Sequence, residues 1–206
     1  MKHVPPPVLF GLGQVLPLLL LSACVSLFNR FQELEDSPIL VSYQTREYRI
    51  RGSTAEDLRQ AMDNKGPLDD LGRPWDAVTH WYISWSYPYS EEGGRCALDP
   101  LDVRVEIVRI LPNWDPPASA SNELIVRWNN YLAALEEHEA YHQELGLEAA
   151  QEVWLALSAM EAYPDCQSLE QAADTTALSV LNRYRRMEDS YDEETSHGAS
   201  QGAVFP

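Results

Sequence analysis

The sequence predicts an α+β domain, residues 38–206, in which an antiparallel sheet packs against one long helix with further helices around it. Residues 77–87 and 103–111 alternate apolar and polar side chains, as half-buried strands do. Residues 124–149 instead repeat apolar side chains at alternating steps of four and three, which is typical of a helix that faces a core.

The expected order of elements begins with a strand and a short helix. Residues 37–50 are rich in β-branched and aromatic side chains and predict one or two strands. Residues 54–64 predict a helix with Ser53 or Thr54 as its cap and acidic residues in its first turn. The Gly66-Pro67 pair ends this helix.

Two strands of an antiparallel hairpin are expected next. In the first, at 77–87, one face carries Thr79, Trp81, Ile83, Trp85 and Tyr87. Core packing is the favoured role of this aromatic face, and a substrate platform is the alternative. Residues 91–95 (EEGGR) make the turn, and residues 103–111 form the second strand, which Pro112 stops.

A Pro-rich connection leads to the long helix, which Ser119 or Ser121 caps and Pro164 ends. Its apolar stripe consists of Leu124, Trp128, Tyr131, Leu135, His138, His142, Leu145 and Ala149. The two histidines are therefore expected to face the core. A last helix is predicted at 168–187, and residues 188–206 are predicted to be irregular.

The N-terminus predicts a lipoprotein signal peptide, residues 1–23. Its apolar stretch, residues 8–21, is too short for an easy bilayer crossing. The sequence that ends in Cys24 resembles a bacterial lipobox, so Cys24 would carry the lipid anchor and residues 24–37 would form a tether. An ordinary secretory signal or a short membrane anchor is the alternative, and each places the body outside the cytoplasm. Val25 after the cysteine favours the outer membrane of a bacterial cell envelope, facing the periplasm.

Charge and cysteine content narrow the partners and the compartment. The net charge of −17 argues against nucleic-acid binding and against electrostatic attachment to anionic lipid. In an oxidising compartment, Cys96 and Cys166 are expected to pair as a disulfide. The alternative is that one of these cysteines binds a metal.

Residues 138–142 read HEAYH, the H-E-x-x-H pattern of zinc-dependent hydrolases. Two histidines four residues apart lie on one face of a helix, so both imidazoles of His138 and His142 can reach one zinc ion. Glu139 is placed to take a proton from the attacking water as a general base. The alternative is a pair of buried histidines that are satisfied by hydrogen bonds.

The third metal ligand does not follow from the usual continuations of this motif. Leu145 and Glu148 stand where one zinc-peptidase class has a Gly and a His. Glu161 has the spacing of a second class, but an unbroken helix would place it about 28 Å from His142. Of the remaining histidines, His80 is expected to lie on the polar face of its strand.

Several short segments follow one another along the chain in this order: Gly52-Ser53-Thr54, Trp81, Trp85, Leu111-Pro112, Tyr131-Leu132, HEAYH, Tyr191-Asp192-x-x-Thr195-x-His197-Gly198 and Gln201-Gly202. Together they resemble the bacterial DUF922 family, which is described as predicted secreted zinc-dependent proteases. The resemblance covers nearly all of the mature chain and implies that His197 is the third zinc ligand. Tyr141 stands where the family often has a small residue, so it would crowd that side of the helix or offer a phenol to the site.

The function expected from these patterns is a lipid-anchored, extracytoplasmic zinc metallopeptidase that cleaves peptide or protein substrates by a zinc-activated water. Tyr141, Tyr191 or the backbone would supply a transition-state donor, and Asp192 would orient a ligand histidine. One alternative is a non-enzymatic envelope lipoprotein whose zinc is structural or absent, with His80 or Cys96 closing the site. Another alternative is an amidase that acts on cell-wall material.

Overall fold

The computed structural model describes residues 39–69, 71–98 and 100–205. The predicted signal peptide (1–23), lipid attachment at Cys24 and tether (24–37) lie outside these residues. Within the described part of the chain, no helix is both long enough and apolar enough to cross a membrane.

The main sheet has three strands in the order β1-β5-β2: β1 is Ile39–Ile50, β5 is Asp102–Trp114 and β2 is Val78–Ser86. β2 runs antiparallel to β5, as predicted, whereas β1 runs parallel to β5. The α+β class is confirmed, but the sheet is mixed rather than antiparallel throughout. The reason is the order of the strands. β2 runs in the opposite direction to β1, and β5, which follows β2, then runs in the direction of β1 and takes the central place between them.

The alternation of side chains in β2 and β5 follows the sequence pattern. Val103, Val105 and Ile107 of β5 are buried. Trp81 and Trp85 of β2 pack against the same core cluster, which confirms the core-packing interpretation of the aromatic face.

A second, two-stranded sheet interrupts the predicted hairpin. β3 (Tyr89–Glu92) and β4 (Arg95–Leu98) pair around Gly93 and Gly94, which both have positive φ, so the EEGGR turn belongs to this small hairpin. β2 and β5 pair, but they are not directly connected. Cys96 of β4 is bonded to Cys166, which confirms the predicted disulfide and joins the small hairpin to the start of the last helix.

Three helices have clear capping signals. α2 (Ala55–Lys65) begins at a capping box in which the Thr54 side chain accepts from the Asp57 amide, so Thr54 rather than Ser53 is the cap. α3 (Asn122–Ser158) is capped by Ser121 and ends a few residues before the predicted limit. α4 (Cys166–Thr195) is capped by Asp165.

The prediction of an irregular tail is wrong for residues 188–195, which continue α4. This last part of the helix turns partly buried polar residues inward, including Glu188 and Asp192, so its inner face has no apolar periodicity to detect. A 3₁₀ turn, η1 (Ala199–Gln201), follows, and the chain reaches buried Phe205.

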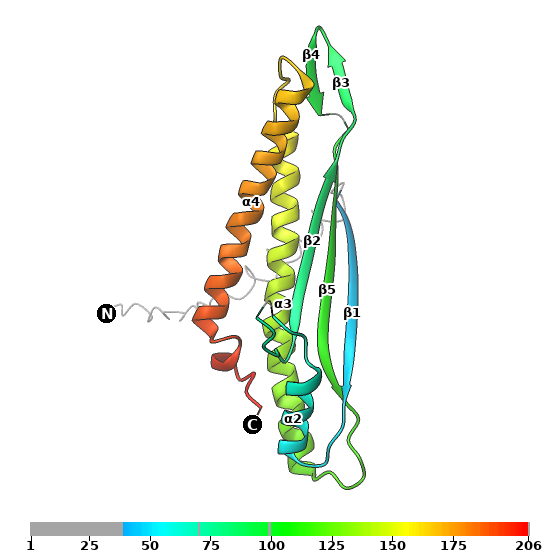
Figure 1. The fold of residues 1–206 in the computed structure, drawn as a ribbon, viewed down its shortest axis with the longest axis vertical. Helices are drawn as coiled ribbons and strands as arrows, with labels where there is room; N and C mark the ends of the chain where they lie inside the picture. Colours follow the sequence, from blue (N-terminus) through cyan, green and yellow to red (C-terminus); the bar gives the residue numbers. More distant parts are fainter. Residues whose placement is uncertain (1–38, 70, 99, 206) are drawn as a thin grey trace, which may run out of the picture. The chain divides into compact units, whose positions relative to one another are not determined.

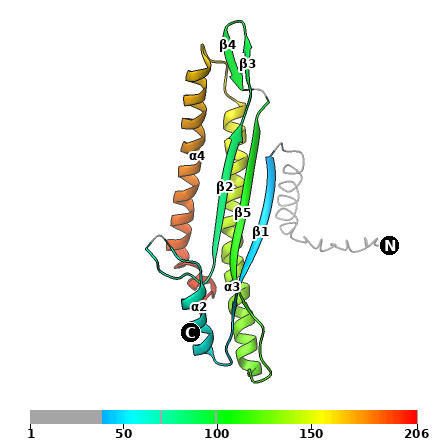
Figure 2. The same cartoon turned by 45° about the vertical axis from the view of Figure 1, so that its right-hand side comes forward.

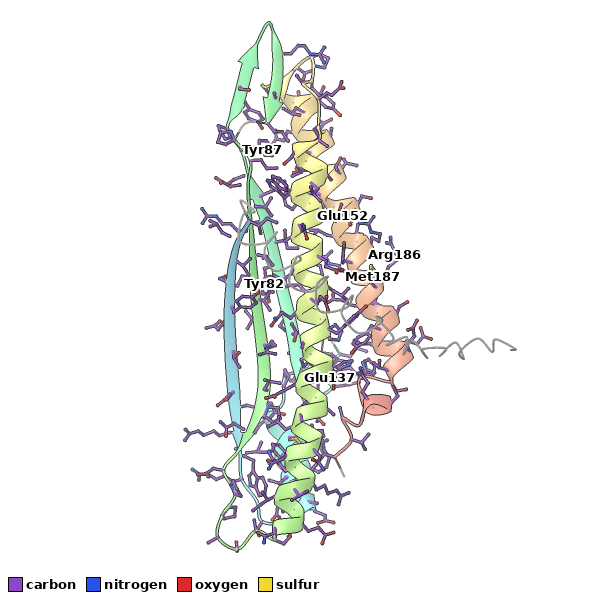
Figure 3. All side chains as sticks on the ribbon, turned by 180° about the vertical axis from the view of Figure 1, so that it is seen from behind. Tyr82, Tyr87, Glu137, Glu152, Arg186 and Met187 are labelled. Atoms are coloured by element: carbon purple, nitrogen blue, oxygen red, sulfur yellow. A yellow bond between two sulfur atoms is a disulfide. The ribbon has the colours of Figure 1, made fainter. Side chains whose placement is uncertain are left out.

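The long helix α3 lies between the sheet and α4 (Figures 1 and 2). α4 runs beside α3 in the opposite direction. Figure 3 shows the same arrangement from behind, with Glu137 and Glu152 on α3 and Met187 on α4. Gly146 of α3 lies directly against Trp81 of β2, since a Cβ at Gly146 would meet Trp81 Cγ at 2.7 Å. This close approach explains the one glycine within the helix.

Candidate metal centre

The HEAYH residues lie on the inner side of α3, as the apolar spacing predicts. His138, Glu139 and His142 are only 4%, 4% and 7% exposed. The stripe of apolar residues before and after them packs on the sheet and α4, so the rotation of the helix that buries the core also turns these three polar side chains inward.

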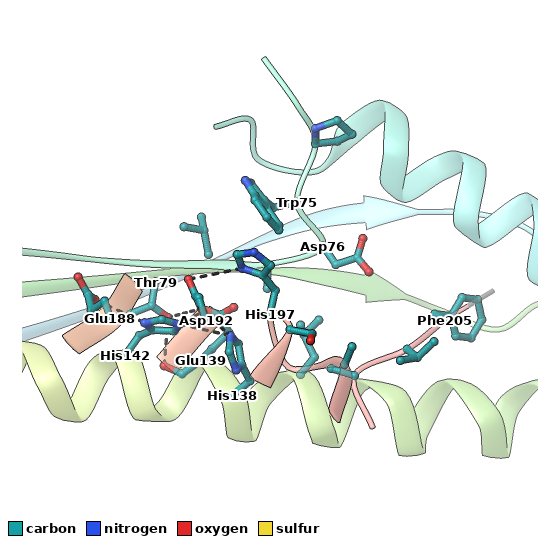
Figure 4. A pocket seen from close by; sticks show the side chains of 18 of the residues that line it. Trp75, Asp76, Thr79, His138, Glu139, His142, Glu188, Asp192, His197 and Phe205 are labelled. Carbon is teal, nitrogen blue, oxygen red and sulfur yellow. Dashed lines mark hydrogen bonds and ion pairs between the residues drawn. The ribbon is translucent and has the colours of Figure 1, made fainter. Parts of the chain in front are cut away.

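The opposite wall of the site is the C-terminal part of α4, which supplies Asp192. Its Oδ1 lies 3.1 Å from His138 Nε2 and 3.0 Å from His142 Nε2. The two Nε2 atoms lie 3.2 Å from each other. Donor atoms of a tetrahedral zinc site, at about 2.0–2.2 Å from the metal, lie about 3.3–3.6 Å apart. The two imidazole nitrogens and the carboxylate oxygen are only slightly closer together than this, so a small outward shift of the side chains would fit a zinc ion between them (Figure 4).

The second nitrogen of each imidazole has its own partner. His138 Nδ1 lies 3.0 Å from Gln201 Oε1, and His142 Nδ1 lies 3.5 Å from Glu188 Oε1. Glu188 is fixed in turn by Trp81 of β2, whose Nε1 donates to the same carboxylate oxygen at 2.6 Å. Acceptors behind ligand histidines set the tautomer and the orientation of the ring in metal sites.

The electrostatic field of the site favours a cation. Burial disfavours the charged form of His142, but hydrogen bonds with Asp192 and Glu188 outweigh it and raise the pKa of His142 to about 10. Burial opposes ionisation of Asp192 as well, yet hydrogen bonds with His138 and His142 hold its pKa well below the usual range. The last turn of α4 contains no basic residue to offset the negative end of the helix dipole.

Glu139 is held by the start of β2. Its Oε2 accepts a hydrogen bond from Thr79 Oγ1 at 2.7 Å, and Thr79 Oγ1 is also 3.2 Å from the backbone oxygen of Glu139. Burial raises the pKa of Glu139, with the Thr79 hydrogen bond acting in the opposite direction. A buried carboxylate with a raised pKa suits a group that accepts and later returns a proton.

The donor triad, Glu139, Thr79 and Glu188 all open onto one cleft of about 590 Å³. Its walls are the loop before β2, the inner faces of α3 and α4, and the C-terminal residues. Among the residues that line it are His138, Glu139, His142, Asp192, Trp75, Asp76, Thr79, Glu188, His197 and Phe205 (Figure 4).

His197 lies at this cleft but outside the donor group. The close triad among the described residues is His138, His142 and Asp192. The side chain of His197 is 51% exposed, its Nδ1 lies 3.5 Å from the other oxygen of Asp192, and its ring contacts Trp75 with centroids 4.4 Å apart. The role of His197 as third ligand stays a prediction, and the structure places Asp192 nearer to both imidazoles.

The two tyrosines expected near the chemistry lie behind the ligands, and neither is among the residues that line the cleft. Tyr191 stacks on His138 with centroids 4.9 Å apart and an interplanar angle of 13°. Tyr141 contacts Tyr191 at 4.0 Å between centroids. This arrangement supports the ring of His138 from the side away from the cleft.

Neither residue considered for a closed, structural site lies at the donor group. His80 is exposed on β2, where its ring neighbours Tyr82. Cys96 is bonded to Cys166 at the start of α4, about 39 Å of helix away from Asp192.

Sequence reasoning missed Glu188, Gln201 and Thr79. Glu188 and Asp192 are four residues apart, the same spacing as His138 and His142 on α3. Two helices that run in opposite directions thus present one i, i+4 pair each to the same point. This repeated spacing was the available signal, but it identifies no partner until the two helices are known to face each other.

Comparisons with known proteins identify a family. A family model described as "Bacterial protein of unknown function (DUF922)" matches residues 45–198. A search of curated proteins and a search of solved structures found no match. The chain belongs to the DUF922 family.

Proposed function

We propose that this DUF922 protein is a zinc-dependent metallopeptidase that is anchored by lipid at Cys24 on the periplasmic side of the outer membrane. The observation that carries the proposal is the convergence of His138 Nε2, His142 Nε2 and Asp192 Oδ1, all within 3.2 Å of one another, beside the buried Glu139 in an open cleft. Three protein donors that leave a fourth position free are the usual set of a catalytic zinc site.

The ligands in this proposal are His138, His142 and Asp192. A carboxylate, which zinc accepts as a donor, replaces the third histidine that the family resemblance implied. When bound, zinc would supply a Lewis acid that polarises the substrate carbonyl and makes water a better nucleophile at neutral pH.

The remaining steps fall to residues of the chain. Glu139, held by Thr79, takes the proton of the attacking water and delivers it to the departing amine. His197 lies at the cleft on the far side of Asp192, so its imidazole donates a hydrogen bond to the oxygen on which negative charge develops. Glu188, which Trp81 holds in turn, keeps the ring of His142 in place.

Zinc measurement of the purified mature protein tests the ligand assignment. We expect one zinc per chain in the wild type, loss of it in His142→Ala and Asp192→Ala, and retention in His197→Ala. Asp189→Ala is the matched control, because Asp189 lines the same cleft without belonging to the donor triad. Loss of zinc in His197→Ala with retention in Asp192→Ala would restore His197 as the third ligand. A wild type without stoichiometric zinc would refute the proposal.

Hydrolysis of unfolded casein and of a quenched peptide library tests the catalytic role. Glu139→Gln is expected to retain zinc and to lose about 10²–10⁴-fold in rate, the usual contribution of a general base. Glu137→Gln is the control, because Glu137 is exposed on the same helix (Figure 3). Cleavage of cell-wall amides with no cleavage of peptides would instead identify an amidase.

A further inference from the structure

The chain after α4 folds back as a C-terminal arm, residues 197–205, which lies against the metal-binding side of α3. Ser196, His197 and Gly198 all have positive φ (51°, 52° and 80°), which reverses the chain within three residues. Gly198 passes so close to the first histidine that a Cβ there would lie 3.0 Å from His138 Cγ. The reversal is held by backbone bonds from His197 N to Asp192 O and from Ala203 N to Gly198 O.

The reversal places the side chain of Gln201 at the outer nitrogen of His138. Gln201 Oε1 lies 3.0 Å from His138 Nδ1, and the Gln201 amide also contacts the Tyr191 hydroxyl, to which its Nε2 donates at 2.9 Å. Gln201 Oε1 also lies 3.2 Å from this hydroxyl, so Tyr191 holds the whole amide group beside the imidazole, with Oε1 at His138 Nδ1. The Gln201 oxygen at Nδ1 keeps a proton on Nδ1. Nε2, which faces Asp192 in the metal-free site, is then the nitrogen whose lone pair a metal would use in place of the proton.

The arm is fixed at its far end by Phe205. This ring is 6% exposed and packs against both Trp128 and Tyr131 of α3, with centroid distances of 5.4 Å and 5.1 Å. The backbone around Gln201 is thus fixed by the tight reversal before it and by buried Phe205 after it, although the side chain of Gln201 is exposed.

We propose that Gln201 is a positioning residue, and that the C-terminal arm sets the metal-binding tautomer of His138. The inference rests on the proposed metal site for its consequence, but the hydrogen bond itself exists without metal. Loss of the acceptor would let the ring rotate or change tautomer, and loss of such an acceptor costs about 10–100-fold in metal affinity.

Zinc affinity, measured by competition with a chelator, tests the consequence. Gln201→Met removes the acceptor while keeping an unbranched chain, and we expect about 10–100-fold weaker zinc binding. Gln201→Glu keeps an acceptor oxygen and is expected to bind within about threefold of the wild type. The matched control is Gln171→Met, because Gln171 is an exposed glutamine on α4 remote from the cleft. Wild-type affinity in Gln201→Met would overturn the inference.

The NMR signal of the His138 Nδ1 proton, recorded without metal, separates this inference from the proposed function. We expect a slowly exchanging proton in the wild type and in Gln201→Glu, and its loss in Gln201→Met. A wild type that binds no zinc but shows this dependence would refute the metallopeptidase and leave the role of Gln201 standing. A proton signal that is unchanged in Gln201→Met would refute the role of Gln201 whether or not zinc binds.

Discussion

Replacement of Gly146 by Ala is predicted to destabilise the protein, although alanine is the better helix former. A Cβ at this position would lie 2.7 Å from Trp81 Cγ and 2.8 Å from both Cβ and Cδ1 of Trp81. These distances are shorter than any normal carbon contact, so the indole must move. The indole also donates to Glu188, which faces His142, so the shift would reach the metal centre.

The magnitude follows from three contributions. Alanine gains about 1 kcal/mol over glycine within a helix. Overpacking against the indole costs about 1–3 kcal/mol, and loss of the hydrogen bond to a charged acceptor costs about 1.5–3 kcal/mol. The net expectation is a loss of about 3 kcal/mol in the free energy of unfolding, or about 6–12 °C in Tm for a domain of this size.

Urea unfolding followed by circular dichroism measures this change. The double variant Gly146→Ala/Trp81→Leu tests the cause, because a smaller side chain at residue 81 relieves the contact. Gly146→Ala should therefore cost less stability in the Trp81→Leu background than in the wild type. An increase in stability for Gly146→Ala in the wild-type background would refute the reasoning, since helix propensity would then outweigh the contact with Trp81.

Three further predictions concern the disulfide, the helix cap and the metal. Reduction of the Cys96–Cys166 bond, with a sequence separation of 70, should lower the free energy of unfolding by about 4 kcal/mol, and urea unfolding with and without reductant measures it. Hydrogen bonds from Ser53 and Thr54 lower the pKa of Asp57. The stability that Asp57 contributes is therefore fully present above the pKa of an unfolded Asp, about 3.9. This stability is lost as the pH falls through the lower pKa of Asp57 in the folded protein. Asp57→Asn should therefore be less stable than the wild type at pH 7 and approach it in acid, and an equal difference at all pH values would contradict this role. Zinc at 100 times its Kd should stabilise the wild type by about 2.7 kcal/mol, an increment that chelation removes and that Asp192→Ala never shows in thermal unfolding.

Local patterns in the chain were enough to predict most elements of the fold. Period-two alternation identified β2 and β5, and the steps of three and four identified α3 with its inward histidines, because both signals depend on neighbours within one turn or one strand. The parallel pairing of β1 with β5 was not predicted, because it joins residues far apart in the chain. The end of α4 was missed because its inner face is polar there and so lacks apolar periodicity.

The same distinction between local patterns and long-range packing applies to the residues of the candidate site. The spacing of His138, Glu139 and His142 is a property of one helix, so the sequence alone indicated two zinc ligands and a base. Asp192 joins them because α4 runs beside α3 in the opposite direction, which no local pattern encodes. Gln201 reaches His138 through a left-handed reversal and a buried phenylalanine. Chemistry within one turn of helix can be read from residue order, whereas the third donor and the groups that orient the ligands depend on which distant segments the packed core brings together.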